Sequence, residues 1–326
     1  MKAHLTKLQK QLCNALQEGL PICERPFDEL AKFLNSNEIE VLEEIEKLKR
    51  AGIIRRIGAM INYRALGMVS TLVAANVPQE SLREVTEAVN LLKGVSHNYL
   101  RKHYYNLWFT LQSQKAEEIE LTLSNLAGRF GIAFHSLPVV RVFKLDVRFD
   151  AASDDQPLLQ GVEDVPESQA VELDEHQKLV LSKLQDELDL TARPFDFLCG
   201  EGPDEVPVRR IVTELIDKGV IRRIGAVVDH RKLGFVANVL FCCEVRQDRI
   251  VEAGKRLACF GVVSHCYERK SPEDWPYNLF AMMHSRSMGE IQHAISKFTE
   301  AEKIDSFQLL PTEAELKKQP VKYDFC

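Results

Sequence analysis

The chain lacks the features that mark several common classes of protein. Its formal net charge is −6, which disfavours a nucleic-acid binder, because such proteins normally present a basic face. No apolar run approaches the length of a membrane span, and the first ten residues, MKAHLTKLQK, lack the apolar core of a signal peptide. We therefore expect a cytoplasmic protein that has no membrane partner.

Motifs for several chemistries are also missing. The eight cysteines include no CxxC pair and no Cys–His spacing of the kind that binds zinc, so we expect buried, reduced thiols. No glycine-rich phosphate loop and no Ser–His–Asp arrangement is recognisable. The sequence therefore predicts no metal site of the protein's own.

What the chain does contain is an internal repeat whose period is about half its length. Residues 54–67 read IRRIGAMINYRALG, and residues 221–234 read IRRIGAVVDHRKLG. Arg-Pro-Phe recurs at 25–27 and 193–195, and Ser-His-x-Tyr-x-Arg recurs at 96–101 and 264–269. In a chain of 326 residues with a hydrophobic share of 45%, this period indicates two copies of one domain-sized module.

Each copy begins with a pattern typical of a winged helix-turn-helix. In the first copy, helical spacing predicts helices over residues 5–19 and 27–34, and a third from the Asn-Ser-Asn cap at 35–37 to Gly52. The alternating residues 53–61 then predict the first strand of a small wing.

The rest of each copy follows a different order. In the first copy the pattern predicts strands over residues 68–77, 95–100, 105–112 and 133–143. It predicts helices over residues 80–92 and 115–128. This β-α-β-β-α-β order is that of a ferredoxin-like fold. The fold class is therefore α+β, with the two copies packed as an internal pseudo-dimer; a homodimer of the whole chain stays open.

An acidic stretch separates the two copies. Residues 150–172 carry seven acidic residues, two prolines and no Lys or Arg, a composition typical of an extended, solvated linker. We predict winged helix-turn-helix domains at 1–62 and 174–229, ferredoxin-like domains at 63–149 and 230–326, and the linker at 150–173.

The helix-turn-helix pattern raises the possibility of a DNA-binding regulator. The helix that would enter a groove carries five acids instead: Glu38, Glu40, Glu43, Glu44 and Glu46. DNA binding requires Lys and Arg that displace counterions from phosphates. We therefore interpret the helical modules as scaffold and expect no DNA partner, and a haem-responsive or amino-acid-responsive regulator is the alternative function.

The paired arginines of the repeat are candidate carboxylate ligands. They alternate on a predicted strand, so one of each pair faces each way. They either lie in solvent or cap a helix by ion pairing, or they clamp a carboxylate, whose geometry a guanidinium matches with two hydrogen bonds. Their recurrence favours the clamp, and two further arginines, Arg64 and Arg101, also recur in the second copy, as Arg231 and Arg269. The arginines concerned are Arg55, Arg56, Arg222, Arg223, Arg64, Arg231, Arg101 and Arg269.

His97 and His265 hold equivalent positions on predicted strands, each beside a Tyr and an Arg. Such histidines can be structural, but an imidazole can exchange a proton near neutral pH or ligate iron. His230 is a further candidate and stands where the first copy has Tyr63. Trp275 and Tyr277 lie in a longer hairpin of the second copy, which either is an ordinary hairpin or forms a wall for a flat aromatic substrate.

Together these motifs resemble a known family. A winged helix-turn-helix followed by a β-α-β-β-α-β domain resembles the Lrp/AsnC regulators. More narrowly, IRRIGA, SHNYLR with YNLWFTL, and SHCYER with WPYNLF resemble siroheme decarboxylases, in both halves of the chain but not in the linker. The resemblance implies loss of the acetate carboxyl groups at C12 and C18 of siroheme. The product, 12,18-didecarboxysiroheme, is a precursor of haem d1 or, by an alternative route, of haem.

The resemblance also implies a carbon–carbon lyase that needs no cofactor, because the substrate carries the iron. Siroheme, its decarboxylated products and related decarboxylase subunits are the partners it implies. We place the principal site in the second copy, with His265 and His230 as catalytic residues; the binding residues are Arg222, Arg223, Arg231, Arg269, Tyr267, Trp275 and Tyr277. The first copy would supply a second site or an opposing wall through His97, Arg55, Arg56, Tyr63, Tyr99 and Arg101.

Overall fold

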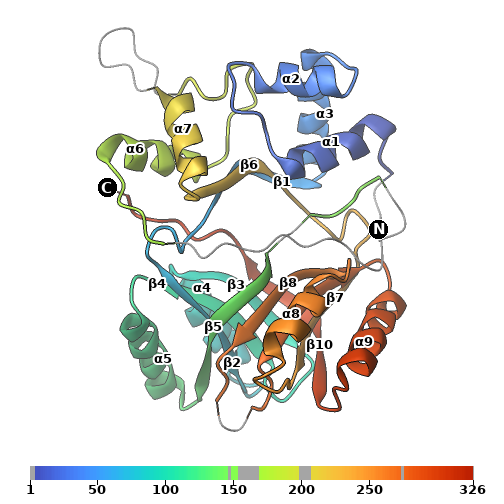
Figure 1. Cartoon of the computed structure of the whole chain (residues 1–326). Coiled ribbons are helices and arrows are strands. Elements are labelled where there is room, and N and C mark those ends of the chain that lie inside the picture. The colour runs from blue at the N-terminus through green and yellow to red at the C-terminus, as the bar shows by residue number, and fades with distance from the viewer. Residues whose placement is uncertain (1–3, 146–147, 153–168, 198–206, 273–274, 326) are drawn as a thin grey trace.

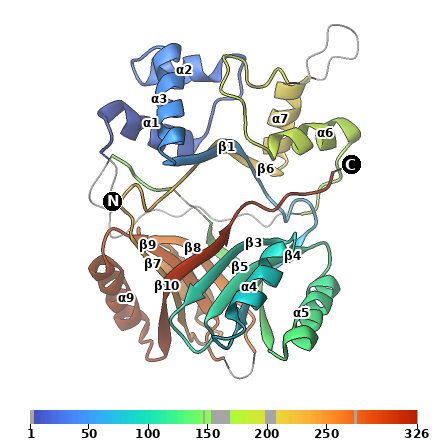
Figure 2. The ribbon, with the colours of Figure 1, turned by 180° about the vertical axis from the view of Figure 1, so that it is seen from behind.

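The computed structural model describes residues 4–145, 148–152, 169–197, 207–272 and 275–325. Helices of both copies form a layer above a two-stranded sheet, and below that sheet lies a barrel with further helices on its outside (Figure 1). Figure 2 shows from behind that the chain crosses several times between the two layers.

The helices of the first module begin and end where the sequence predicts. Its helices are α1 (Lys7–Glu18), α2 (Pro26–Phe33) and α3 (Glu38–Arg50). Thr6 forms a capping box with Gln9, and the Asn37 side chain accepts from the backbone N–H of Glu40, so both caps satisfy N–H groups that the first turn leaves unpaired. The proline of the Arg-Pro-Phe motif lies in the first turn of α2, where its missing N–H costs nothing.

The second module keeps the outline but differs in its middle. It contains α6 (Glu175–Leu184), which an Asp174–Gln177 capping box starts, and α7 (Val208–Asp217). Residues 193–197 form turns where the first module has α2, and residues 198–206 lie outside the described part of the chain. Phe27 and Phe195, the last residues of the two Arg-Pro-Phe motifs, are both buried in a single core that the two modules share.

The two predicted wings form one sheet. The sequence predicts a small wing within each module, but β1 (Ile54–Ile61) and β6 (Ile221–Val228) pair with each other in antiparallel register. Each module contributes one strand here, and an unpaired strand would expose its backbone donors and acceptors. The equivalent strand of the other copy satisfies them, so the repeat motif joins the two halves.

The repeated glycines of this motif allow helices to lie close to the sheet. A Cβ atom on Gly225 would stand 2.4 Å from the carbonyl oxygen of Leu16 in α1, and one on Gly58 would stand 2.8 Å from that of Asp186, just after α6. Each helix end therefore packs on the strand of the other copy, and only glycine leaves room.

The barrel contains four strands from each copy. They are β2 (Val69–Ala75), β3 (Val95–Arg101), β4 (Leu107–Ser113), β5 (Phe134–Leu145), β7 (Ala237–Cys243), β8 (Val263–Arg269), β9 (Leu279–Ser285) and β10 (Phe307–Lys318). Their order around the barrel is β10-β3-β4-β2-β5-β8-β9-β7. Each copy forms a ferredoxin-like sheet, as predicted, and the two sheets join edge to edge through β5–β8 and β10–β3.

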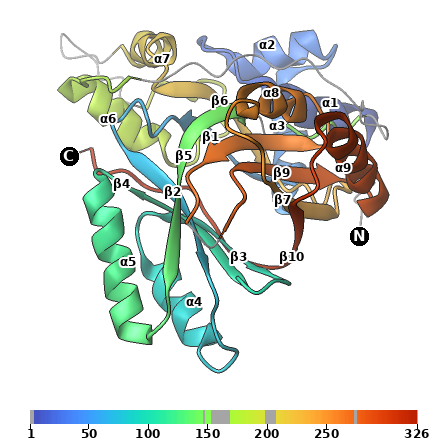
Figure 3. The ribbon, with the colours of Figure 1, turned by 60° about the horizontal axis from the view of Figure 1, so that its bottom comes forward.

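Four helices cover the outside of the barrel. Helices α4 (Leu82–Leu91) and α5 (Ala116–Phe130) pack on the first sheet, whereas α8 (Ile250–Ala258) and α9 (Met288–Glu302) pack on the second (Figure 3). The inner face of the barrel is filled by a separate cluster that includes Trp108, Tyr105, Phe280 and Leu310. Both faces of the sheets are therefore buried against apolar side chains.

Two further expectations concern the linker and membranes. Of the predicted linker at 150–173, the structure describes residues 150–152 and 169–173; the rest lies outside the described residues. Asp150 accepts from the side chain of Asn14 in α1. Among the described helices, none has the length and apolar character that a bilayer crossing requires.

Candidate active site

The Ser-His-x-Tyr-x-Arg motifs lie on β3 and β8, at equivalent places in the barrel. Tyr99 and Arg101 are two residues apart, so both side chains point to the same face of β3. Arg101 points into the barrel, where Nη1 donates to the carbonyl oxygen of Leu310 at 2.6 Å and Nη2 lies 3.9 Å from the Met282 sulfur. The histidine of each motif precedes the arginine by four residues and so lies about 13 Å from it along the strand. It stands at the end of the strand that faces the β1–β6 sheet.

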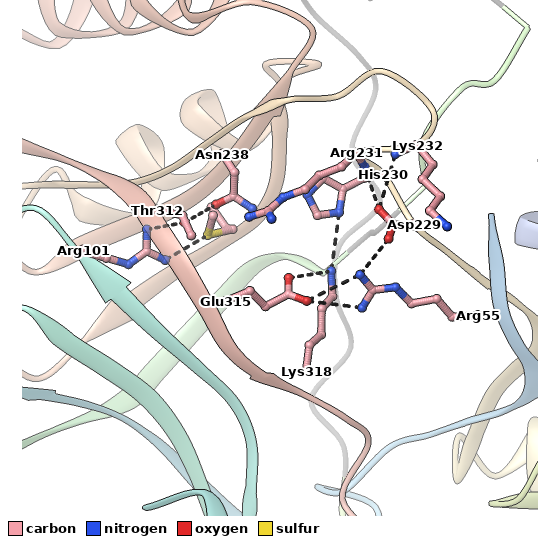
Figure 4. A network of polar contacts seen from close by, with 11 residues as sticks. Arg55, Arg101, Asp229, His230, Arg231, Lys232, Asn238, Thr312, Glu315 and Lys318 are labelled. Atoms are coloured by element: carbon pink, nitrogen blue, oxygen red, sulfur yellow. Dashed lines mark hydrogen bonds and ion pairs between the residues drawn. The ribbon is translucent and has the colours of Figure 1, made fainter. Parts of the chain in front are cut away.

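Residues from both copies gather around His97 in what we term the first cluster. Its members are His97, Tyr99 and Arg101 of β3, Arg55 of β1, Asp229, His230 and Arg231 after β6, and Glu315 and Lys318 of β10. Figure 4 shows several of these side chains pointing toward one another.

Carboxylates pair with two of the basic groups of the first cluster, Arg55 and Lys318. Arg55 Nη2 lies 2.9 Å from Asp229 Oδ2, and its Nη1 lies 3.4 Å from Glu315 Oε1 (Figure 4). Lys318 Nζ lies 3.8 Å from Glu315 Oε2 and 3.5 Å from His230 Nδ1. The protein's own acids thus neutralise Arg55 and Lys318, and tie the β1–β6 sheet to the barrel.

The second cluster lies around Tyr267 and Arg269 of β8, and the ring centre of His265 lies 6.1 Å from that of Tyr267. Its members are His265, Tyr267 and Arg269 of β8, Arg222 of β6, Tyr63 and Arg64 after β1, and Tyr323 beyond β10. Burial raises the pKa of Tyr267 to about 12, although Arg269, Arg222 and Arg64 oppose that rise. The Arg269 guanidinium lies 4.8 Å from the centre of the Tyr267 ring, as in a cation–π contact.

The arginines of the second cluster have neutral partners. Arg222 donates to the Asn62 side chain at 3.1 Å, Arg269 to the carbonyl oxygen of Leu137 at 2.8 Å, and Arg64 to the Tyr63 hydroxyl at 3.3 Å. Among the described residues, no carboxylate forms an ion pair with any of the three. Burial lowers the pKa of Arg222, and that of Arg269 to about 10. Positive charge without a counter-charge is expensive in such surroundings, so this cluster is suited to an anion.

Each cluster contains residues of both copies, whereas the sequence prediction assigned the residues of one copy to one site. We expected His230 and Arg231 to accompany His265, but both lie near Lys318 and Arg55 of the first cluster, and His284 stands between His230 and the Ser264–His265 pair. Tyr63 and Arg64 of the first copy instead lie in the second cluster. The crossing follows from the β1–β6 pairing, because each strand leaves the sheet above the barrel half of the other copy.

The paired arginines do face opposite ways, as predicted. Arg55 and Arg222 point toward the barrel, whereas Arg56 donates to the carbonyl oxygens of Gln185 and Ala59 at 2.8 and 3.1 Å. Arg223 packs beside Gly19 at the end of α1. The structure thus gives Arg56 the helix-capping role that was the alternative interpretation, and it places Arg223 at the equivalent helix end.

The aromatic hairpin lies away from both histidines. Trp275 and Tyr277 are 6% and 9% exposed and belong to the cluster inside the barrel. The ring centre of Trp275 lies 5.4 Å from that of Tyr105 and 5.8 Å from that of Trp108. The rings from the two copies pack together in this one buried cluster. The predicted wall of the second site is therefore a shared hydrophobic plug.

Sequence reasoning gave too little weight to His284. This histidine of β9 is 7% exposed, and its ring centre lies 4.9 Å from that of His230. Ser264 Oγ lies 3.1 Å from His284 Nδ1 and 3.0 Å from His265 Nδ1. His284 has no counterpart in the first copy, so the repeat carried no signal for it. Asp229, Glu315, Lys318 and Tyr323 were missed for the same reason.

Buried histidines should make the fold acid-sensitive. Burial lowers the pKa of His97 to about 4 and that of His230 to about 3. Unfolded histidines titrate near 6.5 and bind protons that the folded rings do not, so stability is present above pH 6.5 and is lost as the pH falls toward 4. We expect the urea midpoint to fall between pH 7 and pH 5. The His230→Tyr variant, which carries the residue of position 63, should show a shallower fall, and an equal slope in both proteins would contradict this origin.

The described residues contain no group of three or more His, Cys, Asp or Glu side chains arranged to hold a metal ion. The six described cysteines are free thiols. Burial raises the pKa of Cys13 to about 12, as expected of an inert core thiol.

Comparison with known proteins places this geometry in a family. A siroheme decarboxylase of Hydrogenobacter thermophilus is 36% identical over 96% of this chain and 94% of its own length. The chain belongs to the siroheme decarboxylase family. A siroheme decarboxylase NirDL subunit of Paracoccus denitrificans is 31% identical over 93% of this chain and 92% of its own length.

Family models and a solved structure agree with this assignment. The siroheme decarboxylase NirDL-like HTH domain matches residues 9–55, and the AsnC-like ligand binding domain matches residues 65–144 and 232–317. The crystal structure of the siroheme decarboxylase NirDL in complex with an iron-uroporphyrin III analogue is 31% identical to this chain. It covers 98% of this chain and 95% of its own, with a TM-score of 0.72.

Proposed function

We propose that the chain is a siroheme decarboxylase that removes the C12 and C18 acetate carboxyl groups of siroheme without oxidation. The main support for this proposal is the similarity to the siroheme decarboxylase of Hydrogenobacter thermophilus, which extends over nearly the full length of both chains. The product, 12,18-didecarboxysiroheme, serves haem d1 synthesis or an alternative route to haem. The reaction class is that of a carboxy-lyase, and no cofactor takes part, because the iron belongs to the substrate.

The second cluster is the better candidate for the reacting site. Siroheme carries eight carboxylates, and guanidinium groups bind carboxylates with two parallel hydrogen bonds. The arginines of the second cluster have only neutral partners, whereas Asp229 and Glu315 already occupy Arg55 in the first cluster. The same two acids would repel an anionic substrate. In the second copy, His265 is the proposed acid–base group and Tyr267 lines the site.

The chemistry requires protons at carbon, in a defined order. Protonation of the pyrrole carbon next to the acetate side chain makes the ring a cation. The C–C bond to the carboxylate then breaks, CO2 leaves, and the electron pair moves into the ring system. A second proton converts the exocyclic methylene to a methyl group. The ring carbon then loses the proton that it gained in the first step. Each decarboxylation therefore consumes one proton net and needs no oxidant. A positioned imidazole can donate and accept the protons that these steps transfer.

The first test is a mass assay on the purified chain. We expect siroheme, incubated anaerobically with the protein, to lose two CO2 units, with an intermediate that has lost one. Heat-denatured protein is the control. Binding without a mass change would show a tetrapyrrole carrier instead. DNA binding that weakens steeply with salt, with siroheme unchanged, would favour a regulator; the acidic α3 helix, where Glu40, Glu43 and Glu46 are exposed, argues against that outcome.

A further inference from the structure

Ser264 lies at the centre of a buried hydrogen-bond cluster behind His265. Its Oγ atom lies 3.0 Å from His265 Nδ1, 3.1 Å from His284 Nδ1 and 3.1 Å from the carbonyl oxygen of Met282. Ser264 and His284 are each 7% exposed. Protein groups therefore dominate the hydrogen bonding of this hydroxyl.

Counting hydrogens fixes the direction of these bonds. A serine hydroxyl has one hydrogen and two acceptor lone pairs, and a backbone carbonyl can only accept. All three contacts are hydrogen bonds only if the single hydrogen of Ser264 goes to the carbonyl oxygen of Met282 and both imidazoles donate to Ser264 through Nδ1. A neutral imidazole that carries its hydrogen on Nδ1 has its lone pair on Nε2.

We propose that Ser264 and His284 are positioning residues that hold His265 in its Nδ1–H tautomer, so that every proton exchanged with the substrate passes through Nε2. This inference rests on the proposed role of His265 in decarboxylation. Ser264 accepts from Nδ1 whether His265 is neutral or protonated. The ring can therefore gain and release a proton at Nε2 without any rearrangement behind it.

His284 contributes by filling the second lone pair of Ser264. Without that donor, the serine hydroxyl would be able to rotate and donate to His265 Nδ1, which would move the lone pair to the wrong nitrogen. Burial holds the pKa of His284 well below its ordinary value, and His230, His265, Lys318 and Arg101 around it add to that effect. This lowered pKa favours the neutral imidazole of His284, which donates to Ser264 through Nδ1.

The first copy lacks this arrangement, although its sequence is similar. Ser96 Oγ lies 2.8 Å from His97 Nδ1 and 2.8 Å from Thr110 Oγ1, and Gln112 stands at the position of His284. Among the described contacts, the Ser96 hydroxyl has only these two partners, both of which can donate or accept. The chain of hydrogen bonds can run either way, so His97 is not fixed in one tautomer. Ser96→Ala is thus a matched control for Ser264→Ala.

The tautomer can be measured without substrate. Long-range 1H–15N spectra of histidine-labelled protein at pH 8 distinguish the protonated from the unprotonated ring nitrogen, and the signal missing in His265→Gln assigns His265. We expect the hydrogen on Nδ1 in the wild type and a shift of population toward Nε2–H in Ser264→Ala. A wild-type His265 that carries its hydrogen on Nε2 would overturn the inference, whatever the protein catalyses.

Steady-state kinetics of Ser264 and His284 variants provide the second test of this proposal. Ser264→Ala should lower kcat by about 10- to 100-fold, the usual effect of removing the partner that orients a functional histidine, and leave KM nearly unchanged. Loss of the acceptor destabilises the imidazolium, so the acid side of the pH–rate profile should move to lower pH. Ser264→Thr keeps a hydroxyl and should restore most of the rate, and His284→Leu should lower kcat in the same direction.

The control variant decides between positioning and general destabilisation. Ser96→Ala should lower kcat clearly less than Ser264→Ala. Equal losses in both variants, or a Ser264→Ala loss without a shift of the pH profile, would show that the serines serve only packing. If no variant or wild-type protein turns over siroheme, the proposed function fails, while the tautomer measured by NMR still tests the hydrogen-bond arrangement.

Discussion

The His265→Ala variant should turn over siroheme about 10²- to 10⁴-fold more slowly than the wild type, which is the usual contribution of a general acid–base group. Binding should be largely intact, because the proposed ligands of the substrate carboxylates are arginines and not the imidazole. Single-turnover rates followed by mass spectrometry give the first quantity. Titration of the tetrapyrrole absorption band gives the second.

The His97→Ala variant is the matched control, because His97 holds the equivalent position in a cluster whose Arg55 and Lys318 pair with the protein's own acids. We expect a smaller loss of turnover in this variant. If both substitutions leave turnover unchanged, the histidines are structural and the site assignment fails. Damage in His97→Ala alone would place the reacting site in the first cluster.

The second large effect concerns Arg222. Its guanidinium points from β6 toward the barrel, with Asn62 as a neutral partner, and burial lowers its pKa. A hydrogen bond to a charged group is worth about 1.5–3 kcal/mol, so Arg222→Ala should raise the dissociation constant of siroheme by about 10- to 150-fold. Equilibrium titration at fixed ionic strength measures this change, and the wild-type affinity should weaken as salt is added.

Arg55→Ala is the counterpart in the first copy. Asp229 and Glu315 already bind Arg55, so its removal should weaken siroheme binding much less. The same substitution should lower the melting temperature, because it removes the guanidinium that pairs with two partly buried carboxylates. Equal losses of affinity in Arg55→Ala and Arg222→Ala would show that both clusters hold substrate carboxylates.

Local signals in the sequence were sufficient for the elements and their order. Helical spacing indicated α1, and the Asn-Ser-Asn cap at 35–37 marked where α3 begins. The alternation of side chains separated the βαββαβ segments of each copy, and the repeat indicated that the copies pair. These features depend on neighbours a few residues apart, which a sequence shows directly.

The sequence by itself also placed the candidate residue types together, since repeated His, Tyr and Arg at two-residue spacing share a strand face. Only the tertiary structure decided which of them meet. Because β1 pairs with β6 and the two sheets close into one barrel, each cluster draws on both copies, so His230 joins His97 and Arg64 joins Arg269. His284 gains its position behind His265 from pairing between β8 and β9. Contacts of this kind join residues far apart in the chain, and no local pattern records them.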